Sequence, residues 1–206
     1  MKKLKPFIWL FLFGSIWGMN EVFLGEMLYR DEVLNSSVIL TVLALFILSI
    51  SRAMINKPGS SALIGTFAAL FRLANTAPSY CHLLGIFILG LTFDVFATLL
   101  IQKDEKAPLK WGLTGAMSTF GNNALFALLI TYVFRYEYWV IGGFSKVSQH
   151  IFISGSISAL LAAFLVPLGF LIGQNGGIFV KRRPRWSYVG TILGSIALWT
   201  MALFLG

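Results

Sequence analysis

The stretch "GIFILGLTFDVFATLL", Gly85–Leu100, decides the fold. Its side chains are almost all apolar, with one carboxylate at Asp94, and the apolar run begins as early as Ser79. A helix needs roughly 20 apolar residues to cross a bilayer. Runs of this kind fill the chain, in which 57% of the 206 residues are hydrophobic and 12% are charged, with a mean hydropathy of +0.82. This composition excludes a soluble globular domain and predicts an integral membrane protein.

The apolar runs predict an all-α integral membrane fold, because lipid offers the backbone no hydrogen-bond partner and the runs lack the alternation of a membrane barrel. Residues 1–174 are expected to form a six-helix membrane domain, and 175–186 a basic cytoplasmic linker containing Pro184. Residues 187–206 are expected to form a seventh, C-terminal helix. The seven expected spans are 7–29, 36–56, 60–77, 79–102, 109–134, 147–174 and 187–206.

The basic residues predict the orientation of these spans. Four of the sixteen fall in one set of alternate loops, at Arg30, Arg72, Arg135 and Lys146. The other twelve are Lys2, Lys3, Lys5, Arg52, Lys57, Lys103, Lys106, Lys110, Lys181, Arg182, Arg183 and Arg185. Basic residues accumulate in cytoplasmic loops, so the N-terminus is expected inside and the C-terminus outside. The same rule accounts for the net charge of +8, and no nucleic-acid partner is expected.

The only cysteine, Cys81, lies in "NTAPSYCHLLG", Asn75–Gly85, at the outer end of the fourth expected span. A free thiol near an oxidising compartment is exposed to oxidation, so its presence there asks for a reason. One interpretation is an inert, packed side chain. The other is a thiolate that binds a metal whose remaining positions a small molecule already fills. His82 adds little as a second ligand, because neighbours on a helix point about 100° apart.

Several polar and aromatic side chains are expected at the same outer face and form the candidate substrate-binding site. The candidates are Cys81, Tyr80, His82, Asn75, Glu21, Glu26, Arg72, Tyr136, Tyr138, Trp139 and His150. The glutamates either line a cavity, because carboxylates in a span face protein or water, or lie outside a membrane that ends near Met19. The aromatic residues are also typical of the belt at membrane interfaces.

Polar residues at bilayer depth need partners. Asp94, together with Asn122 and Asn123 in "STFGNNALF", is expected to form hydrogen bonds between the fourth and fifth spans. Enzyme signatures are weak. A membrane-embedded cysteine enzyme, similar to an exosortase transpeptidase with Arg72 or His150 beside Cys81, is the alternative from another functional class.

The first six spans resemble the S-components of energy-coupling factor (ECF) vitamin transporters. The resemblance lies in the size, the cytoplasmic N-terminus, and the spans "GIFILGLTFDVFATLL", "LTGAMSTFGNNALFALL" and "SGSISALLAAFLVPLGFLIG". It implies vitamin uptake across a bacterial cytoplasmic (inner) membrane by a multi-pass protein. Gly14 and Gly18 stand where the family places small residues that pack against the coupling subunit. No phosphate-binding loop of the G-x-x-x-x-G-K form occurs, so ATPases are implied as separate partners.

Within that family, a solitary group with a cysteine near the third outer loop handles cobalamin, and Cys81 matches that position. The resemblance implies cobalamin, vitamin B12 or a related corrinoid, as the transported ligand. Cys81 would be an axial ligand of cobalt, because the corrin already supplies four nitrogens. Such a thiolate could help to remove an upper ligand such as cyanide; otherwise no enzyme activity is expected. The alternative within transport is another vitamin, with Cys81 as packing. The seventh helix and the absence of an alanine pair in the first span depart from the family pattern.

Overall fold

The computed structural model describes residues 4–31, 33, 35–73, 80–101, 107–182 and 184–205, and every element in these ranges is helical. Six runs are long and apolar enough to cross a membrane: Pro6–Leu28, Ser36–Met54, Tyr80–Leu100, Pro108–Val133, Glu137–Ile178 and Trp186–Phe204. The predicted all-α membrane class is confirmed at this level. The third expected span, 60–77, appears within the described residues as a helix of 14 residues, and positions 74–77 lie outside them. The crossing of the bilayer by the C-terminal helix and the inside position of the N-terminus stay predictions.

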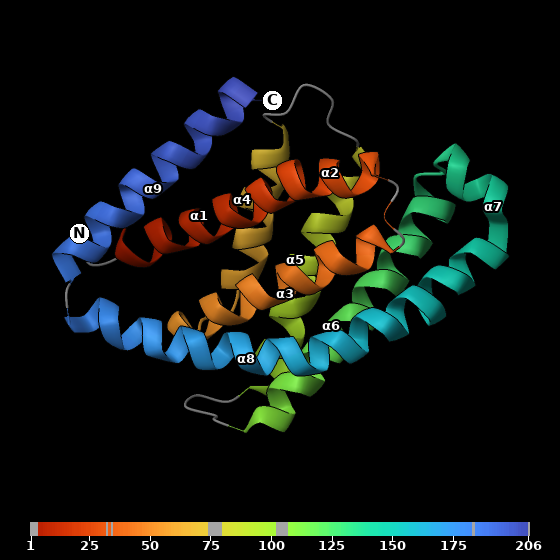
Figure 1. Cartoon of the computed structure of the whole chain (residues 1–206). Helices are drawn as coiled ribbons and strands as arrows, with labels where there is room; N and C mark the ends of the chain where they lie inside the picture. Colours follow the sequence, from red (N-terminus) through yellow and green to blue (C-terminus); the bar gives the residue numbers. More distant parts are fainter. Residues whose placement is uncertain are drawn as a thin grey trace.

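The helices follow one another in a bundle in which neighbours in sequence often pack together (Figure 1). In chain order the elements are α1 (Leu4–Met19), η1 (Asn20–Leu24), α2 (Gly25–Arg30), α3 (Ser36–Met54), α4 (Ser60–Leu73), α5 (Tyr80–Leu100), α6 (Pro108–Leu128), η2 (Leu129–Val133), α7 (Glu137–Ser148), η3 (Gln149–Ser154), α8 (Gly155–Arg182) and α9 (Pro184–Leu205). The most extensive contacts join α8 to α3 and α6, α4 to α1 and α5, and α5 to α6, while α9 lies along α1. We call the end of the bundle that carries α2, α7 and the first turns of α3 and α5 the α7 end.

Glycines bring the inner helices close together. At Gly65 on α4, an added Cβ would lie 3.1 Å from the Cα of Gly90 on α5, so neither position has room for a side chain. On α1, a Cβ at Gly14 or Gly18 would overlap Phe67 or Phe71 of α4. Close backbone approach of this kind is what small residues permit in membrane helices.

The glycine contacts correct one expectation from the sequence. Gly14 and Gly18 were expected to pack against a coupling subunit, and both are buried against α4 of the same chain. The spacing of four residues does place the two glycines on one face of α1, as predicted. The helix that occupies this face is an internal one, which the spacing alone does not specify.

A buried ion pair holds the end of the bundle opposite α7. Asp94 accepts a hydrogen bond from Arg52 at 2.9 Å and two more from the backbone N–H groups of Gly59 and Ser61, at 2.7 and 2.9 Å. The carboxylate therefore caps the N-terminus of α4, where backbone N–H groups lack helical partners. Arg52 also donates to the hydroxyl of Thr98 at 2.8 Å.

This network overturns two sequence-based interpretations. Asp94 was expected to bond across to the fifth span, but it bonds to α3 and to the start of α4. Arg52 was counted as a loop charge, yet it lies inside α3 with its side chain 1% exposed. Burial of a guanidinium is tolerated here because the facing carboxylate and hydroxyl supply acceptors.

Two segments expected to be loops are helical. The segment Arg135–Trp139, which lies between the fifth and sixth expected spans, leads directly into α7, in which Gly143 has a left-handed backbone (φ 56°) that breaks the helix and turns the chain. The expected linker 175–186 forms the end of α8 and the first turn of α9, on either side of position 183. Proline suits the first position of a helix, so Pro184 begins α9 without loss of a hydrogen bond.

Candidate functional site

A cavity of about 720 Å³ lies at the α7 end of the bundle. Its wall draws on η1, the first turns of α3 and α5, the last turns of α6, and α7, η3 and α8. The lining residues are Glu21, Ser36, Ser37, Leu40, Thr41, Cys81, His82, Gly85, Ile86, Leu89, Asn122, Asn123, Phe126, Tyr136, Tyr138, Trp139, Lys146, Gln149, His150, Ser154 and Ser158. The volume is in the range of about 300–1,000 Å³ that is usual for small-molecule sites.

Helices at the α7 end are locally widened to π-helix. The segment η1 carries Glu21, and η3 carries Gln149, His150 and Ser154, all in the cavity wall. The third such segment, η2, leads to Tyr136, whose N–H bonds back to the carbonyl of Ile130 at 3.0 Å. A π-helical turn shifts the direction of side chains, and such turns are frequent at functional sites. The arrangement therefore aims polar side chains from otherwise apolar helices into one space.

Cys81 lies in the first turn of α5 with its thiol free and partly buried. It lines the cavity and packs against an apolar cluster of Ala127, Ile130, Trp139 and Val147. Of the two histidines in the wall, His82 contacts Arg72 through Nδ1, and the His150 ring contacts Phe126 and Trp139. The sulfur therefore lies beside the cavity rather than being enclosed by apolar packing on all sides.

Arg72 does not line the cavity but contacts two residues of its wall. Its guanidinium donates to the backbone carbonyl of Glu21 and, from Nη2, to Nδ1 of His82 at 3.2 Å. Because arginine only donates, Nδ1 must accept, and the ring proton of His82 then lies on Nε2. The carboxylate of Glu21 accepts from Nε1 of Trp17 at 3.0 Å. These contacts fix both residues in the wall.

The α7 side of the cavity is aromatic. Trp139 makes edge-to-face contacts with Phe126 and His150, with ring centroids 5.4 and 5.1 Å apart. The turn at Gly143 brings Lys146 back over the ring of Tyr138, where its ammonium donates to the Tyr138 carbonyl at 3.2 Å. The rings offer flat apolar area, and their polar edges suit a site that opens to water.

Asn122 and Asn123 form the amide pair in the α6 wall. Asn122 is 7% exposed and Asn123 is 4% exposed. The prediction that they bond between the fourth and fifth spans is wrong for these side chains. Within the described part of the chain, Oδ1 of Asn122 and Nδ2 of Asn123 have no hydrogen-bond partner. Both residues line the cavity.

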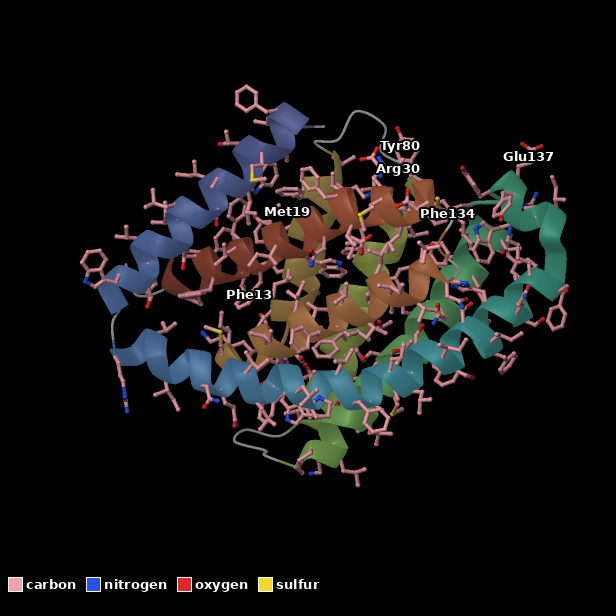
Figure 2. All side chains as sticks on the ribbon, in the orientation of Figure 1. Phe13, Met19, Arg30, Tyr80, Phe134 and Glu137 are labelled. Carbon is pink, nitrogen blue, oxygen red and sulfur yellow. The ribbon has the colours of Figure 1, made fainter. Side chains whose placement is uncertain are left out.

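The structure brings together seven of the residues predicted from the sequence. Those that line the cavity are Glu21, Cys81, His82, Tyr136, Tyr138, Trp139 and His150. Arg72 stands behind the wall and contacts two of these seven. Tyr80 is 80% exposed at the edge of the bundle (Figure 2), and Glu26 is exposed as well, so neither lines the cavity. Asn75 lies outside the described residues.

Sequence reasoning missed most of the polar wall. The residues missed are Ser36, Ser37, Thr41, Gln149, Ser154 and Ser158, together with the roles of Asn122, Asn123 and Lys146. The serines at the start of the second span carried no signal, because hydroxyls commonly bond to their own helix, as Ser158 does to the Ser154 carbonyl. The consecutive asparagines did carry a sequence signal, since an amide pair in a span needs polar partners.

In the described residues no group of three or more His, Cys, Asp or Glu side chains could hold a metal ion. The cavity offers one soft ligand, Cys81, to a metal that arrives with other ligands attached. No family model, no curated protein and no solved structure matches the chain, so these residues and their geometry carry the functional argument.

Proposed function

We propose that this protein captures a corrinoid such as cobalamin at the α7 end and holds its cobalt with Cys81, as an S-component-like uptake protein of a bacterial cytoplasmic membrane. The observation that carries the proposal is the place of Cys81 in the wall of the cavity, with a free and partly buried thiol. A thiol packed among apolar side chains without a cavity would offer nothing to a ligand.

The chemistry of the site supports a ligand that brings its own metal. A corrin ring supplies four nitrogens to cobalt, so a single thiolate completes an axial position, and soft sulfur suits such a metal. Flat aromatic area at Tyr136, Tyr138 and Trp139 lies along the same cavity. A macrocycle can pack against this surface while its metal meets the sulfur.

The two alternatives make different demands on Cys81. Another vitamin would use the same cavity and leave the thiol as packing. A cysteine enzyme needs a base that activates the thiol. In the described structure the His150 ring contacts Phe126 and Trp139, and Nδ1 of His82 accepts from Arg72, so no thiol–imidazole pair is among these contacts. The transporter proposal needs no such pair.

The test is the absorption spectrum of aquacobalamin mixed with the purified protein in detergent. Sulfur ligation displaces the bound water on cobalt and shifts the corrin bands, and we expect this shift with the wild type and its loss in Cys81→Ala. Tyr80→Phe is the matched control, because Tyr80 is the neighbouring residue and lies outside the cavity. An identical spectrum for wild type and Cys81→Ala would refute cobalt ligation.

A further inference from the structure

A second cavity, of about 670 Å³, lies at the end of the bundle opposite α7. Its wall is formed by the first turns of α1 and α9, the last turns of α3 and α8, and the residues that follow α3. The ends of α1, α8 and α9 meet on the side of the bundle where Figure 1 marks the N-terminus. None of the described residues that line this cavity also lines the one that holds Cys81. The second cavity is therefore a separate site and does not depend on the proposed function.

The second cavity lies at the level where four of the candidate spans begin or end. The spans that contain α1 and α9 begin at Pro6 and Trp186. Those that contain α3 and α8 end at Met54 and Ile178. Three of these four residues line the cavity, and the fourth, Trp186, lies two positions before the lining residue Tyr188. Apolar spans end where the hydrocarbon core of the bilayer meets the lipid head groups, so the cavity lies at head-group depth.

The wall of the second cavity combines apolar and polar side chains. Met54, Ile178 and the ring of Trp9 supply apolar area from three helices. Asn56 and Asn175 supply carboxamides, and both residues are exposed, so a ligand can reach their N–H donors. A phospholipid has the same two parts, because its acyl stem is apolar and the phosphate and ester oxygens of its head accept hydrogen bonds.

Lys57 brings a positive charge to the second cavity. The residue is exposed and lines the cavity. Its backbone is held in place, because the carbonyl accepts hydrogen bonds from Arg52 and from Oγ of Ser60, and the N–H donates to the carbonyl of Ile55 at 2.9 Å. Arg52 is also the counter-ion of Asp94. The lysine is therefore presented from a fixed turn, which lowers the cost of ordering it around a ligand.

Arg182 continues the positive charge along α8. Gln174 and Ile178 line the cavity, and Arg182 follows at the same interval of four residues, so it lies on the same face of the helix one turn further along. Its side chain is exposed. No acidic residue is among the described residues of the cavity wall. An anionic head group would therefore meet two cations, each of which favours its binding.

We infer that the second cavity binds an anionic phospholipid, with the phosphate beside Lys57 and Arg182 and the acyl stem against the apolar part of the wall. Basic pockets between membrane helices are known to take anionic head groups. A free phosphate ion would use the two cations but leave the apolar wall without a partner. A zwitterionic lipid would fill the apolar wall but bring its own cation close to Lys57 and Arg182. Charge and apolar area together thus select the anionic lipid.

The experiment is native mass spectrometry of the purified protein in neutral detergent, with equal amounts of phosphatidylglycerol and phosphatidylcholine that carry the same acyl chains. We expect the wild type to retain phosphatidylglycerol about tenfold or more over phosphatidylcholine. Lys57→Gln and Arg182→Gln should each lower this preference about fivefold, the factor that one basic residue contributes near an anionic lipid surface. Lys57→Arg should keep the preference. The matched control is Arg30→Gln, which removes an exposed cation at the α7 end and should also keep it.

A second variant tests the cavity without changing its charge. A Cβ added at Gly177 would lie 4.0 Å from Cα and Cγ of Met54, which leaves room for a side chain in the wall. Gly177→Phe should therefore fill part of the cavity and lower the amount of bound phosphatidylglycerol while both cations remain. Gly190→Phe on α9 is the matched control, because nothing lies within 4 Å of an added Cβ there and Gly190 is not in the wall. This control should bind lipid as the wild type does.

Four outcomes would overturn the inference. The first is equal retention of the two lipids by the wild type. The second is a loss of preference in Arg30→Gln as large as that in Lys57→Gln, because total charge alone would then act. The third is unchanged lipid binding in Gly177→Phe. The fourth is displacement of bound phosphatidylglycerol by millimolar inorganic phosphate, because the site would then take phosphate from solution. The spectrum of Cys81→Ala tests the proposed function separately, at the other end of the bundle.

Discussion

The two ends of the bundle treat buried polar groups in opposite ways. At the end opposite α7, Asp94 accepts three hydrogen bonds, one from Arg52 and two from the backbone at the start of α4. At the α7 end, Asn122 and Asn123 lie beside a cavity, and an amide atom of each has no partner in the described structure. A satisfied network rigidifies a fold, whereas a buried polar group without a partner carries the cost of its lost hydration. The role of a polar residue within a span therefore follows from its partners rather than from its type.

The largest effect expected from this comparison is on Asp94. Asp94→Ala leaves the guanidinium of Arg52 buried without its counter-ion and uncaps α4, and we expect a loss of about 3–5 kcal/mol in the free energy of unfolding. The measurement is thermal or denaturant unfolding in detergent, with Asn122→Leu as the matched control at the other end. The control should change stability little. Equal losses in the two variants would show that the ends do not differ.

A second test concerns the α1–α4 contact that supports the cavity wall. Gly18→Ala places a methyl group against the ring and Cβ of Phe71, and α1 must shift to accept it. We expect a loss of about 1–3 kcal/mol, measured as above, because overpacking forces neighbouring groups apart. Gly190→Ala on α9 is the control, because nothing lies within 4 Å of an added Cβ there. If Gly18→Ala left the free energy of unfolding unchanged, α1 would not hold this wall rigidly.

The position of α9 gives a third and smaller effect. Nε1 of Trp199 donates to Oγ of Ser15 on α1 at 2.9 Å, and the Trp199 ring stacks on Phe11 with centroids 5.8 Å apart. Ser15→Ala removes the acceptor and should cost about 1 kcal/mol. Trp199→Phe should then cost less in the Ser15→Ala background than in the wild type, because only the packing of the larger indole ring remains to be lost. If the two substitutions instead add fully, the hydrogen bond does not couple the helices.

Six of the seven expected spans coincide, in the described residues, with helices long and apolar enough to cross a membrane. They could be predicted because the length of an apolar run is set directly by bilayer thickness. The same one-dimensional argument placed Cys81 correctly, since a residue at the start of the fourth run must lie at one end of the bundle. It also placed Glu21 and Trp139 at that end, and both line the cavity. Topology thus located the part of the site that depends only on distance along each helix.

The partners of polar side chains could not be predicted in this way. Arg52 was assigned to a loop because its charge suits one, yet the side chain turns inward to Asp94, 42 residues away along the chain. Asn122 and Asn123 looked suited to bond across to the fourth span, but the rotation of α6 turns them to the cavity. Helix rotation and tilt depend on packing against neighbours, which hydropathy does not encode. Asn75 and the other residues of 74–79 lie outside the described residues.

The smallest expected effect concerns Lys146, on the α7 side of the cavity. Lys146 donates to the Tyr138 carbonyl and lies over the Tyr138 ring, close to the turn at Gly143. Lys146→Met keeps the length and apolar stem but removes the ammonium, and an exposed cation–π contact is worth about 0.5–1 kcal/mol. We expect a loss of that size in unfolding, with Lys146→Arg closer to the wild type because it retains the charge. If Lys146→Met lowered the free energy of unfolding as much as Asp94→Ala does, the α7 end would depend on a buried polar contact in the same way as the opposite end. The contrast between the two ends would then fail.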